Sequence, residues 1–365
     1  MNAINYNIDK SGFLRPKINE NCKNCGICLK CCPGASLLRD YSSPIIKSVY
    51  GYSLDNDTRL DSASGGVLTE LLCFLIENSI VSYVTVVTNH KENVPKVILT
   101  NDTKIIRANK ASKYCPIDYG DLIHQIEKIG GFVAIVGVPC VINSIQEYTK
   151  LNKRIGKKIK FFFSLFCNHT PSYHALDYLR ENNNIVSYDA VFYRGGGWPG
   201  FFQFKLSNNL ISKIPYRFAM RKGVGRYFKN VRCELCDDPF GDSADASFGD
   251  AYFCEKETLG QTLIIIRNVE ISNILERMKG CQVNISVLDN LDSISKFYKK
   301  MLWRHTNTRE FAYFLKAKGK NIVNLKSIEP SSPNVFSKVR YMKKMFLCNI
   351  GKHKLLWKLL YRYAN

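Results

Sequence analysis

The sequence predicts an α/β fold with a small N-terminal ferredoxin-like cysteine loop, a larger body around a mostly parallel sheet, and a basic helical tail. Apolar strand-like runs alternate with helix-like segments in the first half of the body, which is the pattern of a parallel sheet covered by helices. Closely spaced cysteines precede this region, and a basic segment without acidic residues follows the body. We therefore divide the chain into residues 1–50, 51–326 and 327–365.

The N-terminal segment contains the spacing C-x2-C-x2-C-x3-C-P, formed by Cys22, Cys25, Cys28 and Cys32 with the following proline. Thiolates at this spacing select an iron–sulfur cluster, because successive cysteines reach separate corner irons of a 4Fe–4S cube. Structural zinc sites generally use two separated C-x2-C pairs. Disulfides need an oxidising compartment, and residues 1–10 lack the pattern of a secretory signal. The motif predicts an electron-transfer protein whose thiols lie in the cytoplasm.

The body is expected to begin with a buried helix, capped at its start by the Ser-Ala-Ser-Gly-Gly segment of residues 62–66. Apolar periodicity and turn residues then set the elements. In chain order we expect a helix over 67–76, a strand over 81–88, a helix over 119–129, a strand over 132–136, a helix from 139 to about 148, a strand over 160–166, a helix from 171 to about 180, strand-like residues 186–204 broken by a loop at 195–200, and a strand over 263–267.

The formal charge of +21 excludes few partners by itself. The sequence has no zinc-finger histidines, RNA-binding aromatic signature or helix-turn-helix, so no specific nucleic-acid partner is expected. An acidic redox partner, such as a ferredoxin-like protein, explains the charge as well as an anionic membrane surface does. No segment reaches the roughly 20 apolar residues of a membrane-spanning helix.

Residues 327–333 are expected to form a linker, and residues 335–363 carry lysines and arginines among apolar residues with no acid. This composition is typical of an amphipathic segment that binds an anionic membrane surface, which would place the protein at the inner membrane face. A C-terminal helix that packs on the body and exposes a basic face explains it equally well.

A second group of cysteines follows predicted strands or lies in a tight loop: Cys140, Cys167, Cys233 and Cys236. Four thiols suffice for one further cluster. The sheet would bring Cys140 and Cys167 together at the carboxyl ends of their strands, where open α/β sheets place their sites. In the alternative interpretation these two are buried small hydrophobic residues, and the C-x2-C pair binds zinc.

Several short motifs follow one another along the body, within a resemblance that covers about residues 10 to 300. They are Ser62-Ala63-Ser64-Gly65-Gly66, Ala111-Ser112-Lys113-Tyr114, Gly137-Val138-Pro139-Cys140, Tyr193-Arg194-Gly195-Gly196, Cys233-Glu234-Leu235-Cys236 and Ala244-Asp245-Ala246-Ser247-Phe248-Gly249-Asp250. This series resembles the coenzyme F420 hydrogenase/dehydrogenase beta-subunit family. The resemblance implies a flavoprotein that binds FAD and iron–sulfur. Some members oxidise or reduce a deazaflavin, and many bacterial relatives are associated with surface polysaccharide synthesis.

The resemblance also implies roles for single residues. Cys140, Cys167, Cys233 and Cys236 would hold a cluster beside the flavin. The helix start with Ser62, Ser64, Gly65 and Gly66 would receive the FAD pyrophosphate, because glycine lets the backbone approach and the helix dipole favours an anion. Lys113, Tyr114 and the loop with Tyr193, Arg194 and Gly195 would line the flavin. No catalytic residue is predicted.

Residues 1–21 contain no cysteine, whereas ferredoxin domains of the family commonly carry two tandem cysteine runs. The fourth ligand of an N-terminal cluster is therefore open among Cys32, Cys31, Cys73, Cys115 and Cys254. We expect an oxidoreductase that passes electrons between a ferredoxin-like partner, 4Fe–4S clusters, FAD and an organic substrate. The rivals are a cluster-binding electron-transfer subunit without flavin and a zinc-stabilised binding protein.

Overall fold

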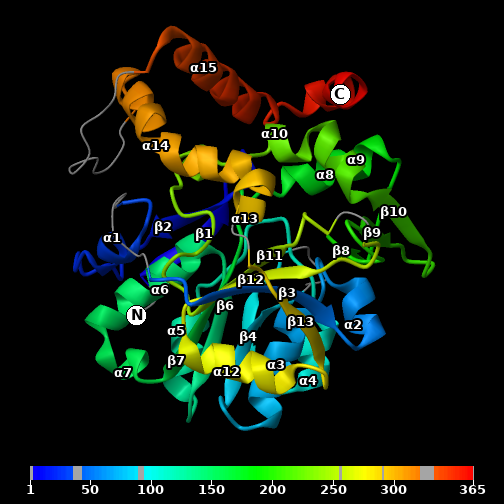
Figure 1. Ribbon diagram of the computed structural model, residues 1–365. Helices are drawn as coiled ribbons and strands as arrows, with labels where there is room; N and C mark the ends of the chain where they lie inside the picture. Colours follow the sequence, from blue (N-terminus) through cyan, green and yellow to red (C-terminus); the bar gives the residue numbers. More distant parts are fainter. Residues whose placement is uncertain are drawn as a thin grey trace.

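The computed structural model describes residues 3–35, 43–88, 94–254, 257–289, 292–320 and 333–364. An eight-stranded sheet forms the centre of the molecule (Figure 1). Its strands, in spatial order, are β13 (Val283–Val287), β3 (Lys47–Ser53), β12 (Thr262–Ile266), β11 (Ala246–Asp250), β7 (Ile159–Leu165), β6 (Val133–Gly137), β4 (Tyr83–Val87) and β5 (Val97–Thr100).

The sheet is mostly parallel, as the sequence predicts. Strands β4, β6, β7 and β11 pair in parallel with their neighbours, and β3 runs in the same direction because two antiparallel pairings separate it from β11. Only β5, β12 and β13 run the other way among the eight strands. The carboxyl ends of the parallel strands therefore meet at one edge of the sheet.

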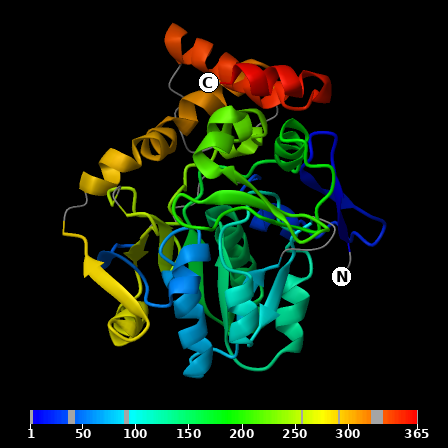
Figure 2. The same ribbon diagram turned by 90° about the vertical axis from the view of Figure 1, so that its right-hand side faces the viewer.

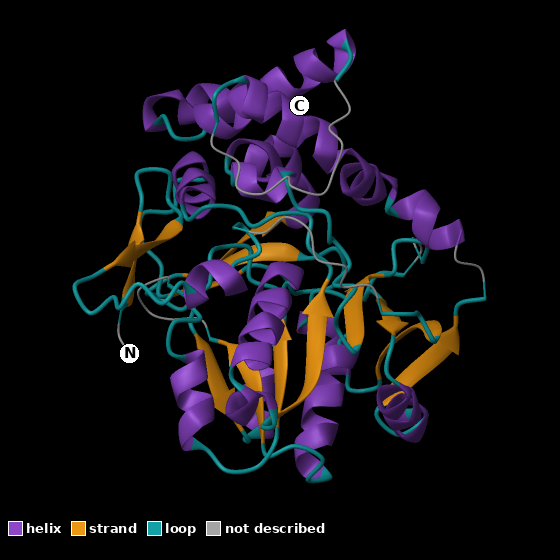
Figure 3. Ribbon diagram, turned by 90° about the vertical axis from the view of Figure 1, so that its left-hand side faces the viewer, coloured by secondary structure: helices purple, strands orange, loops and turns teal. Residues whose placement is uncertain are grey.

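Helices cover both faces of the sheet, because alternate residues of each strand point to opposite sides. On one face, α3 (Val67–Glu77) and α12 (Val269–Met278) pack with Ala134 of β6 into a continuous apolar core. On the other, α5 (Leu122–Lys128), α6 (Pro139–Leu151) and α7 (Lys153–Gly156) pack against Val133 and Ile135 of the same strand. Figure 3 shows the strands between these helices.

The predicted helices and strands of the body are present with slightly different bounds. The main shifts are the helix expected at 171–180, which is α8 (His174–Asn182), and residues 186–204, which form β8 (Ala190–Phe192) and β9 (Phe201–Lys205) around the expected loop. The predicted cap of α3 is wrong, because its N-cap is Gly66 at φ 84° with no side-chain hydrogen bond.

A second layer lies beyond the carboxyl edge of the central sheet. It contains the three-stranded sheet β10-β9-β8, with β10 at Ile211–Pro215. Short helical segments follow: α9 (Tyr216–Ala219), the π-helical η1 (Met220–Val224), α10 (Gly225–Tyr227) and α11 (Val231–Glu234). These elements and α8 share an aromatic core that includes Tyr178, Tyr193 and Phe204.

The C-terminal helices lead from the body to an outermost layer, and the last of them lie at the top of Figures 1 and 2. They are α13 (Asp292–Phe297), α14 (Lys299–Ala317), α15 (Val335–Ile350), η2 (Lys354–Leu356) and α16 (Trp357–Tyr363). Tyr341 and Trp357 are buried against the body. The linker expected at 327–333 lies outside the described residues except for Pro333. Among the described helices, none is long and apolar enough to cross a membrane.

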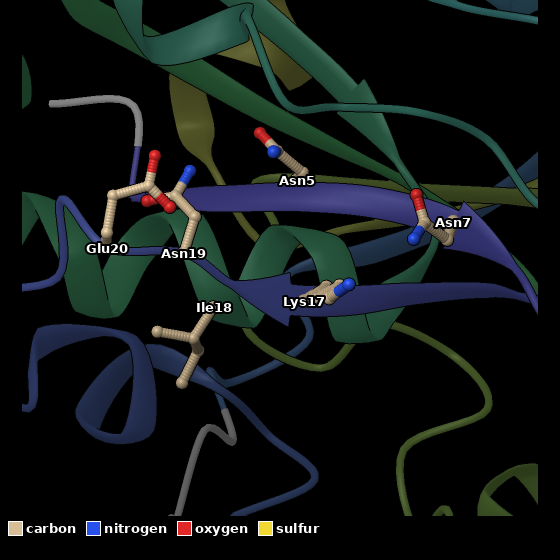
Figure 4. Close-up of a pocket in the computed structure, with 6 residues that line it drawn as sticks. All are labelled: Asn5, Asn7, Lys17, Ile18, Asn19 and Glu20. Carbon is tan, nitrogen blue, oxygen red and sulfur yellow. The ribbon is translucent and has the colours of Figure 1, made fainter.

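The N-terminal segment is a hairpin of β1 (Ile4–Ile8) and β2 (Leu14–Ile18) followed by α1 (Ile27–Cys31). Helix α1 packs against α6. Further short helices are α2 (Asn56–Asp61), which precedes α3, and α4 (Thr103–Ala108), which packs against α3. The hairpin has a shallow pocket of about 420 Å³, and the described residues that line it belong to the two strands and to the residues that follow β2 (Figure 4).

Candidate functional site

A cavity of about 1260 Å³ lies at the carboxyl edge of the central sheet. Its floor is built from the ends of the parallel strands, including Val86 and Val87 of β4, Gly137 of β6 and Leu165 of β7. The far wall comes from the segment of α9 to α10. Open α/β sheets bind their ligands at this edge, and the volume is ample for a cofactor the size of a dinucleotide.

The predicted phosphate-binding segment forms one wall of this cavity. Ser62, Ser64 and Gly66 line it, whereas Gly65 does not. A Cβ on Gly65 would lie 2.4 Å from the carbonyl oxygen of Gly51, so Gly65 permits close packing against β3. Ser62 Oγ is buried without a hydrogen-bond partner among the described residues. An unpaired buried hydroxyl beside the start of α3 fits a bound anion.

The predicted pair Lys113 and Tyr114 also lines the cavity. The Lys113 ammonium donates to the carbonyl oxygens of Asn109, Lys110 and Ala111 at 3.1, 2.8 and 3.1 Å. Burial lowers its pKa to about 8. Lys113 therefore caps the carbonyl groups at and after the carboxyl end of α4. Its ammonium is fully hydrogen-bonded, and the residue still borders the cavity.

The tyrosine of this pair belongs to an aromatic wall. The rings of Tyr114 and Tyr216 are 5.4 Å apart with an interplanar angle of 36°, and both residues line the cavity. Tyr114 Oη accepts a hydrogen bond of 2.9 Å from Arg194. Aromatic faces held in this way suit a planar ring system.

Three of the other predicted flavin-lining residues lie behind the wall. Tyr193, Arg194 and Gly195 are not among the cavity-lining residues. Tyr193 is buried in the aromatic core, where burial raises the pKa of its phenol. Gly195 has φ 134° in the turn of the loop. They shape the wall and do not border the cavity.

The buried Arg194 and the half-buried Asp250 form an ion pair, with Nη2 3.2 Å from Oδ1. The Trp198 indole nitrogen donates to the same Oδ1 at 2.7 Å, and the Tyr252 hydroxyl donates to Oδ2 at 3.3 Å. Arg194 also donates to the carbonyl oxygen of Ala63. This network ties the glycine-rich loop, the end of β11 and the segment before α3 into one rigid wall.

The cavity is strongly basic. Eight lysines and arginines line it: Lys110, Lys113, Arg217, Arg221, Arg226, Lys229, Lys296 and Lys299. Among the described residues that line it, Asp250 is the one acidic residue, and its carboxylate is neutralised by Arg194. Such a cavity attracts an anionic ligand. Arg217, Arg221 and Arg226 were not among the predicted site residues, although their clustering in an otherwise aromatic stretch is a signal for an anion-binding segment.

The predicted second cysteine group lies beside this cavity. Gly137 pairs with Ser164 across β6 and β7, and Cys140 and Cys167 follow these residues by the same number of positions. Cys167 lines the cavity, and its backbone nitrogen donates to the Pro239 carbonyl at 2.9 Å. The sheet therefore brings the Cys140 and Cys167 backbones to one edge, next to the loop that carries the C-x2-C pair.

Cys233 and Cys236 approach Cys140 closely enough to affect its ionisation. Cys140 keeps an exposed surface, but the protein around its sulfur raises the pKa of the thiol to about 12, and the thiols of Cys236 and Cys233 contribute to the rise. Cys236 Sγ lies 3.5 Å from the carbonyl oxygen of Asp238. A set of neighbouring thiols is the donor set that an iron–sulfur cluster uses.

The predicted N-terminal cysteines lie next to this second group. Arg232, which precedes Cys233, donates through Nη2 to the Pro33 carbonyl at 2.6 Å. A Cβ on Gly34 would lie 3.3 Å from Cys32 Sγ and 3.4 Å from Arg232 Nε. Cys25, Cys28 and Cys32 are exposed, and Cys22 is partly exposed.

The remaining candidates for a fourth N-terminal ligand lie in different places. Cys31 is buried within α1, Cys73 in the core beneath α3, and Cys115 in the aromatic core, while Cys254 packs near α13. No three His, Cys, Asp or Glu side chains in the described ranges are grouped so that they could hold one metal ion. A cube differs from a single ion, because each cysteine binds a separate iron.

Comparison with known proteins links these features to a family. Residues 48–124 match the N-terminal model of the coenzyme F420 hydrogenase/dehydrogenase beta subunit, and residues 131–287 match the C-terminal model. The two matches together span well over half of the chain. They include the α3 start, Lys113, the second cysteine group and Asp250.

Two individual relatives come from one organism. A coenzyme F420-dependent sulfite reductase of Methanocaldococcus jannaschii is 24% identical over 335 residues, which are 82% of this chain and 48% of that protein. This chain thus spans about half of that relative's length. An uncharacterised protein of the same organism is 24% identical over 254 residues, which are 67% of this chain and 91% of that protein.

A solved structure shares the fold. A chain of the F420-reducing NiFe hydrogenase complex from Methanosarcina barkeri superposes with a TM-score of 0.58 at 18% sequence identity. The alignment covers 74% of this chain and 94% of that chain. Nearly all of the hydrogenase chain is therefore matched, and the likeness supports the α/β architecture described above.

Proposed function

This chain belongs to the coenzyme F420 hydrogenase/dehydrogenase beta-subunit family, and on that basis we propose that it is an iron–sulfur flavoprotein oxidoreductase. It would exchange electrons with a ferredoxin-like or other redox partner through 4Fe–4S clusters and FAD, and exchange a hydride with an organic substrate. The observation that carries this proposal is the basic cavity at the carboxyl edge of the sheet, which Cys167 lines, together with the contact of the C-x2-C loop with the N-terminal segment.

The residues around the cavity fit an anionic dinucleotide. The start of α3 offers Gly66, Ser64 and the unpaired hydroxyl of Ser62 to a pyrophosphate. The tyrosine pair Tyr114 and Tyr216 offers aromatic faces to a ring system. A bound flavin would supply the conversion between hydride transfer and single-electron transfer.

The chain's own residues prepare this site. The ion pair of Arg194 and Asp250 fixes the wall that carries Tyr114, so the cavity is formed before a ligand enters. Because the two charges neutralise one another, the carboxylate does not repel an anion. The arginines of the α9 to α10 segment then attract the phosphates from the opposite wall.

The cysteines would hold the clusters. Cys140, Cys167, Cys233 and Cys236 are the proposed ligands beside the cavity, and Cys22, Cys25, Cys28 and Cys32 those of the N-terminal motif. The contact between Arg232 and Pro33 supports close placement of the two groups. Short spacing between redox centres is what an electron-transfer subunit requires.

The substrate is proposed only by class. The name of a relative that matches 82% of this chain describes it as coenzyme F420-dependent, so a deazaflavin is the first substrate to test. A polysaccharide-pathway precursor is the second, and we place the reaction in the cytoplasm. The basic cavity favours an anionic member of either class.

The competing function is a non-catalytic iron–sulfur subunit without flavin. Anaerobic reconstitution with iron, sulfide and FAD, followed by quantification of all three per chain, separates the two. We expect flavin absorbance together with a broad cluster shoulder, and release of FAD on denaturation. Cluster absorbance without retained flavin would favour the competing function, and a colourless protein would contradict both.

A further inference from the structure

Helix α15 has two apolar faces, and only one of them packs on the protein. The inner face buries Tyr341 and Cys348, which are 1% and 6% exposed. Lys344 on the same side pairs with the buried Glu234 at 2.5 Å. These contacts hold α15 in a fixed orientation on the body, so its other face is permanently presented outward.

The outer face of α15 carries an apolar stripe formed by Val335, Val339, Met342 and Phe346. Their spacing of four, three and four residues places them along one side of a helix. They are 71%, 56%, 48% and 62% exposed, and Phe336 beside them is 82% exposed. A soluble helix normally turns polar residues to water, and a continuous exposed apolar stripe marks an interaction surface.

Basic residues flank this stripe. By helical spacing, Lys338 and Lys343 lie on its two sides, and both are exposed. The described C-terminal residues 333–364 contain eight lysines and arginines and no aspartate or glutamate. The same composition continues beyond α15, where Leu355 is 99% and Leu359 55% exposed beside Lys354 and Lys358.

We propose that the outer face of α15, together with the exposed side of η2 and α16, binds the surface of an anionic lipid membrane. Apolar side chains would enter the interface between head groups and acyl chains while the flanking lysines meet lipid phosphates. A second copy of this chain is a poor occupant, because it would bring an equally positive, acid-free face against this one. The proposal rests neither on the flavin nor on the clusters.

The experiment is co-sedimentation of the purified full chain with vesicles. One set contains phosphatidylglycerol and phosphatidylethanolamine, and the other contains only phosphatidylcholine. We expect binding to the anionic vesicles that weakens steeply with added salt, and little binding to the neutral ones. Absence of binding to anionic vesicles at low salt would overturn the proposal, as would equal binding to both sets.

Variants locate the surface. The double change Val339→Ser and Phe346→Ser should weaken binding about tenfold or more, and Lys338→Glu with Lys343→Glu should weaken it by a similar or larger factor. The matched controls are Phe132→Ser with Leu151→Ser, which are both 51% exposed, and Lys153→Glu with Lys157→Glu near α7, at the opposite end of the molecule (Figure 1).

All substituted side chains are exposed, so each variant should keep the melting temperature of the parent chain. Size-exclusion chromatography is run in parallel. If the α15 variants bind vesicles like the parent, or if they change only the oligomeric state, the outer face serves another partner and the proposal is wrong. If the control variants lose binding as strongly as the α15 variants, net charge and not this surface is responsible.

Discussion

The guanidinium of Arg194 and the carboxylate of Asp250 meet inside the protein, with Nη2 3.2 Å from Oδ1 and the arginine side chain 1% exposed. The guanidinium also lies 4.4 Å from the ring centroid of Tyr216. Around this pair converge β11, the glycine-rich loop and the segment before α3. The ion pair is thus the point at which the cavity wall is assembled.

Replacement of Arg194 by methionine should destabilise the protein by about 2 to 4 kcal/mol, because it leaves the half-buried Asp250 carboxylate without its cation and with only the hydrogen bonds from Trp198 and Tyr252. Chemical denaturation followed by circular dichroism measures the change. Arg217→Met is the matched control: Arg217 is exposed and lies over the Trp198 ring at 5.5 Å. Its loss should cost less than about 1 kcal/mol. Equal losses of stability in both variants would contradict the role of the ion pair.

Arg194 also illustrates which features of the fold and the site can be predicted from the sequence. Apolar periodicity placed the helices and strands of the parallel sheet correctly, because local burial repeats with the period of each element. Periodicity does not predict the direction in which the side chain of a loop residue points. Arg194 lies between an apolar run and a pair of glycines, a position that a ligand-binding arginine could also have. Its contact with Asp250, which the sequence pattern does not reveal, places the side chain within the protein wall and not in the cavity.

Two further features escaped prediction for related reasons. The start of α3 has serines that suggest a side-chain cap, but Gly66 takes a positive φ and occupies the N-cap position. Arg221 and Arg226 lie on either side of Gly223, which has φ 112° in the π-helical turn. A break of this kind disrupts the 3.6-residue period, so periodicity does not predict that Arg226 lines the same cavity as Arg217 and Arg221.

Lys113 should give the protein a distinct pH dependence. Burial lowers its pKa to about 8 in the folded chain, whereas an unfolded lysine titrates near ~10.4. Between these values the unfolded chain binds more protons, so the contribution of Lys113 to stability rises with pH across this window, by at most about 3 kcal/mol. Below the folded pKa both states are protonated and the contribution is constant.

The measurement is the unfolding free energy of the parent chain and of Lys113→Met at several pH values from neutral to mildly alkaline. The parent should gain stability relative to the variant as pH rises above 8. The difference in unfolding free energy between the two proteins is taken at each pH. This removes the contribution of the buried thiols, whose ionisation changes with pH in both proteins. A constant difference across the window would show that Lys113 has an ordinary pKa.

The cysteine groups predict how iron is distributed. After anaerobic reconstitution, Cys140→Ser and Cys25→Ser should each remove about half of the iron and sulfide if each group holds one cluster, and the double variant should remove nearly all of it. Cys281→Ser is the matched control, since Cys281 is also exposed but belongs to neither group. Iron unchanged in both single variants would place the clusters elsewhere, and zinc without sulfide would favour a structural zinc site.

The contact between Lys344 and Glu234 links the C-terminal layer to the C-x2-C loop. Glu234 lies between Cys233 and Cys236, is 5% exposed, and receives Lys344 at 2.5 Å and Lys229 at 3.3 Å. Lys344→Met should therefore destabilise the protein by about 1 to 2 kcal/mol and not more, because Lys229 still neutralises the carboxylate.

The matched control for Lys344→Met is Lys343→Met, because Lys343 is the neighbouring residue and is exposed. Thermolysin digestion reports on α15 without cutting at lysine, and urea unfolding reports on the whole chain. We expect faster cleavage around α15 in the Lys344 variant only, since Lys344 holds the helix to the loop while Lys343 faces outward. Identical digestion of the two variants would mean that α15 is held by Tyr341 and its apolar neighbours alone, and that the C-terminal layer does not stabilise the cysteine loop through charge.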